Sequence, residues 1–119
     1  MINGAHFIIF SQDAEATRAF FRDALGMPSV DAGEGWLIFA LPPAELAAHP
    51  TAGAVTQELY LMCDDIDSTV AELRQKGVEF SGEISEQDWG RLTAMKVPGA
   101  GLVQLYEPKH PSPLHAAAK

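Results

Sequence analysis

The sequence has a single cysteine, lacks a long apolar run and carries few basic residues. Cys63 has no second cysteine with which to form a disulfide, and a lone cysteine is typical of proteins from reducing compartments. No segment approaches the roughly 18 to 20 consecutive apolar residues that cross a bilayer, and the N-terminus lacks the basic and apolar segments of a signal peptide. We therefore expect an unprocessed cytoplasmic protein that does not enter a membrane.

The charge balance is strongly acidic. The chain has 16 Asp and Glu residues against 8 Lys and Arg residues, which gives a formal net charge of −8. A surface of this sign repels phosphate backbones and anionic lipids, so nucleic acid and membranes are not expected as partners. A cationic small molecule stays open as a ligand.

The chain alternates between strand-like and helix-like periods, and the same order occurs twice. Asp13 and Asp65 stand where helix N-caps are expected, and Gly26 and Gly77 stand where those helices should end. Extended apolar segments surround both helices: residues 7–10, 36–41 and about 45–50 in the first half, and 58–63, 78–84, 91–97 and 101–107 in the second. Each half is therefore predicted as a strand, a helix and two or three further strands.

The length of 119 residues, 47% of them hydrophobic, is that of one compact domain over residues 1–119. Within it we predict module one over about residues 3–52 and module two over about 55–108. The remaining tail, 109–119, contains His110 and His115, which we expect to be frayed.

The register between the two halves decides which residues are equivalent. Aligning the caps Asp13 and Asp65 carries His6 onto Glu58, whereas aligning the terminal glycines carries it onto Gln57. A strand covered by a helix on one face should be apolar on that face, and only the first alignment satisfies this condition. The apolar face is then Leu59, Leu61 and Cys63. His6 and Glu58 are thus predicted at corresponding positions that face away from the helices.

Three segments carry a resemblance to a known family: "HFIIFSQDAEATRAFFRDALG", "ELYLMCDDIDSTVAELRQKGVEF" and "PGAGLVQLYEP". Over residues from Asn3 to about Pro111 the chain resembles the glyoxalase, bleomycin-resistance and extradiol-dioxygenase group, the vicinal oxygen chelate superfamily. The resemblance implies an α+β fold with two βαβββ modules, whose mixed sheet curls into an open barrel around a cavity.

The resemblance also implies a divalent metal, bound by the first and last strands of each module. The matching positions here are His6, Glu58 and Gln104, with His49 as the candidate fourth ligand and Glu45 of the same parity behind it. These N and O donors suit Zn, Mn, Fe, Ni or Co better than Ca or Mg. Gln104 replaces the more usual carboxylate, which lowers the expected affinity, and His49 can equally belong to a surface loop.

The small-molecule ligand is expected in the cavity, on the strand faces that point away from the helices. No catalytic residue is assigned from the sequence. The side chains expected to contact the ligand are Phe10, Tyr60, Met62, Trp89, Arg91, Leu102 and Tyr106.

Two functions are consistent with these features, and we favour the first. The first is a metal-dependent enzyme, a lyase or isomerase of the glyoxalase kind or a dioxygenase, that chelates adjacent substrate oxygens. The alternative is a metal-free protein of the bleomycin-resistance type that sequesters an aromatic or cationic compound. In either case we expect a homodimer, since pairing would cover the open sheet edges, and His6 of one chain can then meet Glu58 of the other.

Overall fold

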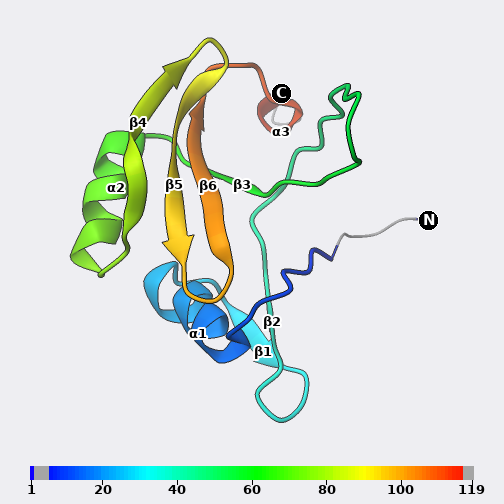
Figure 1. Ribbon diagram of the computed structural model, residues 1–119, viewed down its shortest axis with the longest axis vertical. Coiled ribbons are helices and arrows are strands. Elements are labelled where there is room, and N and C mark those ends of the chain that lie inside the picture. Colours follow the sequence, from blue (N-terminus) through cyan, green and yellow to red (C-terminus); the bar gives the residue numbers. More distant parts are fainter. Residues whose placement is uncertain (2–5, 117–119) are drawn as a thin grey trace.

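The computed structural model describes residue 1 and residues 6–116, and shows an α+β fold with one two-stranded and one four-stranded sheet (Figure 1). Residues 3–5, at the start of the predicted module one, and residues 117–119 of the predicted tail lie outside the described residues. In the described part, no helix is both long enough and apolar enough to span a membrane.

The first half of the chain forms a helix and a small hairpin. Helix α1 (Ala14–Ala19) begins at the predicted N-cap, where Asp13 Oδ1 accepts from the Ala16 amide at 3.1 Å. A π-helical segment, Phe20–Ala24, continues it up to Gly26, whose φ of 67° is the left-handed backbone expected after a helix. Strands β1 (Ser29–Asp31) and β2 (Leu37–Phe39) then pair antiparallel; β2 was predicted and β1 was not.

The second half forms the predicted strand, helix and three strands. These are β3 (Tyr60–Met62), α2 (Ile66–Gln75), β4 (Phe80–Gln87), β5 (Gly90–Val97) and β6 (Gly101–Pro108). The strand order is β3-β6-β5-β4, in which β3 is parallel to β6 and the other pairs are antiparallel. Helix α2 lies against the sheet, and a short helix α3 (Pro113–Ala116) follows in the tail (Figure 1).

Two predicted strands of the first half are not formed. Residues 6–10 and 45–50 belong to no strand, so the sheet is not closed. An extended segment becomes a strand only when a neighbouring backbone satisfies its hydrogen bonds. Residues 42–50 include three prolines, which cannot donate to a ladder. The extended residues 6–10 have no ladder partner in the described part of the chain, and the side chain of Phe10 is 92% exposed.

The hydrophobic core lies between the four-stranded sheet and the helices. Ile66 of α2 and Met95 of β5 are fully buried at its centre, and Phe20 and Phe21 join them from the first half. Leu59, Leu61 and Cys63 pack against this core, which confirms the predicted helix-facing parity of that segment. The side chains that alternate with them therefore lie on the other face of the sheet.

The two halves are joined where the start of α1 meets the turn between β5 and β6. The Gln12 amide donates to the Gly99 carbonyl at 2.8 Å, and Thr17 Oγ1 donates to the Pro98 carbonyl at 2.5 Å. Gly99 has a φ of 78°, and a Cβ there would lie only 2.7 Å from the Asp13 amide nitrogen. Only glycine therefore allows this close approach of turn and helix.

Candidate functional site

Three aromatic side chains form a cluster on the sheet face that points away from α2. We call Tyr60, Trp89 and Tyr106 the aromatic cluster. The ring centroids lie 5.6 Å apart for Tyr60–Tyr106 and for Trp89–Tyr106, and 6.2 Å apart for Tyr60–Trp89, all in edge-to-face arrangement. Such pairs add about 0.5 to 1.5 kcal/mol each beyond area burial. Tyr106 is 8% exposed and Trp89 is 42% exposed. Tyr106 is thus the buried member of the cluster, and Trp89 is the member that a ligand can reach from solvent.

The strand register explains how the sequence builds this cluster. Tyr60 is opposite Gln104 in the β3–β6 pairing and Met62 is opposite Tyr106, so these four residues share one face. Trp89 lies in the turn between β4 and β5 and is followed by Gly90. A Cβ at Gly90 would lie 2.8 Å from the Glu107 carbonyl oxygen and 3.3 Å from the Tyr106 ring. The glycine therefore lets the Trp89 turn pack closely over β6.

The hydroxyl end of Tyr106 meets two polar side chains, Glu45 and His110, and the sulfur of Met62. The Tyr106 hydroxyl donates to Glu45 Oε1 at 3.3 Å, lies 3.2 Å from His110 Nε2, and is 3.3 Å from the Met62 sulfur. The carboxylate of Glu45 comes from the loop before β3, and its side chain is only 15% exposed. His110 lies two residues after the end of β6, and its Nδ1 donates to the Pro111 carbonyl at 2.9 Å.

The environment keeps both tyrosines of the cluster in the phenol form. Burial raises the pKa of Tyr106, and the neighbouring Glu45 carboxylate raises it further. Burial also raises the pKa of Tyr60, together with the hydrogen bond that its hydroxyl donates to Glu58 Oε1 at 3.0 Å. Both groups are therefore hydrogen-bond donors at neutral pH.

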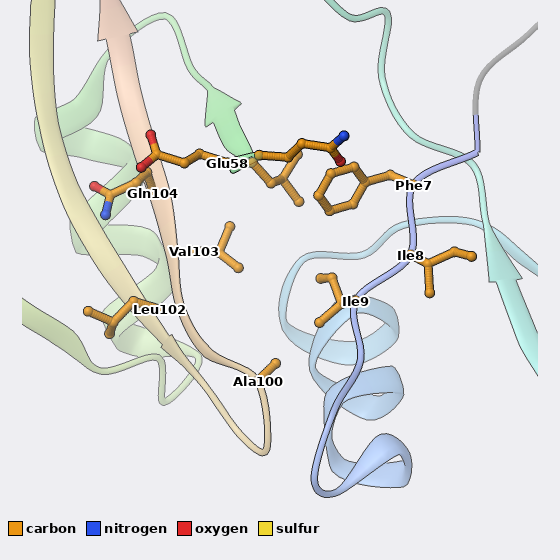
Figure 2. A pocket seen from close by; sticks show the side chains of 10 residues that line it. Phe7, Ile8, Ile9, Glu58, Ala100, Leu102, Val103 and Gln104 are labelled. Atoms are coloured by element: carbon orange, nitrogen blue, oxygen red, sulfur yellow. The ribbon is translucent and has the colours of Figure 1, made fainter. Parts of the chain in front are cut away.

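A cleft of about 330 Å³ lies beside this face, between residues 7–9 and the start of the β3–β6 pair. Glu58 and Gln104 line it and extend to the same side, whereas Ile9 and Val103 project into the space between the two segments (Figure 2). The other lining residues are Phe7, Ile8, Gln57, Leu59, Ala100 and Leu102. The cleft thus brings together two of the four side chains that the resemblance assigns to a metal.

The remaining two predicted metal ligands lie elsewhere. His6 and His49 are exposed, and neither lines the cleft with Glu58 and Gln104. Across the described residues, no three His, Cys, Asp or Glu side chains come close enough together to hold a metal ion. Within a single chain, the four predicted ligands are therefore not arranged to bind one metal ion. The predicted metal site stays a prediction.

Three predicted ligand contacts also lie away from the aromatic cluster. Leu102 lines the cleft instead. Phe10 is 92% exposed on the segment that forms no strand. Arg91 is opposite Glu107 on the α2 side of the sheet, where it donates to Asp67 at 2.8 Å and to Glu86 at 2.6 Å. These hydrogen bonds raise the pKa of Arg91 and hold its side chain, so we leave it out of the proposed site.

Sequence reasoning gave little weight to two residues that the structure places at the cluster. Glu45 was considered only as a backup for His49, and His110 was expected in a frayed tail. His110 is held because the Lys109 amide donates to the Trp89 carbonyl at 2.8 Å, which fixes the chain just before it. No sequence pattern encodes this contact; the one available signal was that His110 follows the last strand within two residues.

The comparison with protein families agrees with the fold. The family model of the glyoxalase/bleomycin resistance protein/dioxygenase superfamily matches residues 4–110. The chain belongs to this superfamily. The resemblance seen in the sequence is thereby confirmed, and the comparison with curated proteins gave no match.

Solved structures of superfamily members share the fold at low sequence identity. TnmS3, an antibiotic-binding protein from Streptomyces sp. CB03234, has a TM-score of 0.66 at 24% identity over 92% of this chain and 99% of that one. Lactoylglutathione lyase from Agrobacterium tumefaciens has a TM-score of 0.64 at 18% identity over 88% and 92%. A Nocardioides member has a TM-score of 0.64 at 17% identity over 95% and 90%. One of these relatives binds an antibiotic and another is a lyase, so the superfamily alone leaves the activity open.

Proposed function

We propose that this protein binds and sequesters a small aromatic or cationic molecule, without a metal, on the aromatic cluster. The observation that carries the proposal is the convergence of Tyr60, Trp89 and Tyr106 on the sheet face away from α2. Ligand sites in proteins are typically lined by aromatic side chains with a few polar groups that set orientation, and here Glu45 and Glu58 supply those groups. TnmS3, which shares the fold, is an antibiotic-binding protein, and this supports the same class of function.

Tryptophan fluorescence tests this proposal, because the chain has two tryptophans and only Trp89 belongs to the cluster. In a Trp36→Phe variant, a panel of aromatic and cationic aromatic compounds should include at least one that quenches or shifts the emission of Trp89. The matched Trp89→Phe variant keeps Trp36, which is 68% exposed, and should not respond to the same compound. A flat response across a broad panel, or an equal response of both variants, would count against the proposal.

A metal-dependent lyase, isomerase or dioxygenase is the second candidate, because Glu58 and Gln104 share one cleft. A bound divalent metal would act there as a Lewis acid toward adjacent substrate oxygens. This candidate function needs at least one further metal ligand. We propose His6 of a second copy of the chain for this role. Titration of Mn, Zn, Ni, Fe and Co should then show sub-millimolar affinity that His6→Ala abolishes. Lack of such affinity in the unaltered protein would remove this candidate.

A further inference from the structure

We infer that Glu45 is the cation-binding group of the ligand site. When no ligand is bound, His110 of the same chain occupies the place of the ligand's charged end beside Glu45. The inference rests on the proposed function, since it names the group that recognises the charged end of the ligand. The ligand class that follows is an aromatic compound with an amidinium, guanidinium or ammonium group.

The Glu45 carboxylate is largely buried and only partly hydrogen-bonded. Its side chain is 15% exposed, and Oε1 accepts from the Tyr106 hydroxyl at 3.3 Å. Its other oxygen, Oε2, is buried, and no donor in the part of the chain that the structure describes lies within hydrogen-bond distance. A buried carboxylate oxygen without a donor is costly, so a group that brings N–H donors and positive charge would be favoured there.

This carboxylate lies at the end of the aromatic cluster. The Tyr106 ring contacts Tyr60 and Trp89, while its hydroxyl contacts Glu45. A flat ligand packed along the exposed Trp89 edge could therefore direct one end toward Glu45. Aromatic faces attract cations, a planar amidinium or guanidinium can bind a carboxylate through two parallel hydrogen bonds, and the net charge of −8 favours approach of a cation.

The His110 imidazole lies beside the same carboxylate, on the side of Glu45 Oε1. Its Nε2 is 3.9 Å from Glu45 Oε1 and 3.2 Å from the Tyr106 hydroxyl. Its ring centroid is 6.0 Å from that of Tyr106, with the two planes tilted by 35°. The side chain is 33% exposed and follows the last strand, so it can turn away without breaking a sheet hydrogen bond. His110 therefore competes with a ligand for Glu45.

The experiment compares benzamidinium with benzamide, a neutral molecule of nearly the same shape. Binding is followed by Trp89 fluorescence in the Trp36→Phe background. We expect Glu45→Gln to weaken benzamidinium binding about tenfold or more, which corresponds to about 1.4 kcal/mol, and to weaken benzamide binding by a clearly smaller factor, because benzamide carries no charge. His110→Ala should strengthen benzamidinium binding at least about threefold, roughly 0.65 kcal/mol by the same relation. The control Glu83→Gln, at an exposed site on β4, changes the net charge equally and should have no effect.

The outcomes separate the two levels of the proposal. Equal affinities for benzamidinium in Glu45→Gln and its parent would overturn the assignment of Glu45, while aromatic binding itself would stand if benzamide still binds. Weaker or unchanged benzamidinium binding in His110→Ala would overturn the competing role of His110. If neither probe binds the parent or His110→Ala, the cation site is wrong, and the fluorescence panel then decides whether aromatic binding fails as well. Circular dichroism of each variant shows that its fold is kept.

Discussion

At the scale of single residues, Cys63 shows how burial alters chemistry on the core side of β3. Burial is the largest influence and raises the pKa of its thiol; a hydrogen bond with Thr69 opposes this, and the carboxylates of Glu107, Asp64 and Asp65 raise the pKa further. A raised pKa leaves less thiolate at pH 8, and the thiolate is the form that reacts. We predict that iodoacetamide alkylates the native protein at pH 8 at least about tenfold more slowly than free cysteine.

The matched control is the same protein unfolded in urea, in which the thiol should react as a free cysteine does. Mass spectrometry of quenched time points measures both rates. A native rate equal to the unfolded rate would show that the thiol is not protected, and would contradict the placement of Cys63 against the core.

The residues of the aromatic cluster differ in how far the sequence could predict them. Tyr60 and Tyr106 follow from alternation, because their strand neighbours Leu61 and Leu105 belong to the core. The contact of Glu45 with Tyr106 could not be predicted in this way. Glu45 lies in a loop whose path is set by tertiary contacts rather than by a local period.

At the scale of elements, the approach of the β5–β6 turn to α1 gives a stability prediction. Gly99 and Gly101 both have positive φ, 78° and 73°, but a Cβ at Gly101 has open space whereas one at Gly99 meets Asp13 and Ser11 within 2.8 Å. Gly101→Ala should therefore lower the unfolding free energy by only about 1 to 2 kcal/mol, the cost of placing alanine in a left-handed backbone conformation. Gly99→Ala should lower the unfolding free energy by about 1 to 3 kcal/mol more than Gly101→Ala does, because the contact between the two halves must also shift.

Urea unfolding of both variants and the parent measures this difference directly. Equal losses of unfolding free energy in the two variants would contradict the prediction. They would mean that the close contact between the β5–β6 turn and the start of α1 contributes little to stability. The amide of Gln12, which donates to Gly99, should also exchange faster in Gly99→Ala if the joint opens.

Helices and strands were not equally predictable. Both helices follow from local signals, since Asp13 and Asp65 accept from backbone amides at their starts and Gly26 and Gly77 end them with positive φ. For residues 6–10 and 45–50, by contrast, the local sequence does not show which strand, if any, they would pair with. Whether an extended segment joins a sheet depends on a distant backbone, and in the described chain neither segment has one.

At the scale of the whole molecule, exposed apolar side chains that precede β3 in the sequence are the reason to predict a homodimer. Phe10, Leu46 and Val55 are 92%, 99% and 92% exposed. A second copy that covered these side chains would remove their apolar surface from water. We predict by light scattering after gel filtration a mass of twice the chain's 12.8 kDa. A mass of 12.8 kDa at every concentration tested would contradict this prediction.

The central claim is that ligands bind on the sheet face formed by the aromatic cluster. Amide chemical-shift mapping by NMR, with the compound that most strongly quenches Trp89, tests it most directly. We predict that the largest changes fall on Tyr60, Met62, Trp89 and Tyr106 and on their sequence neighbours. Changes confined to the cleft beside residues 7–9, or to α1 and the β1–β2 hairpin, would contradict the claim.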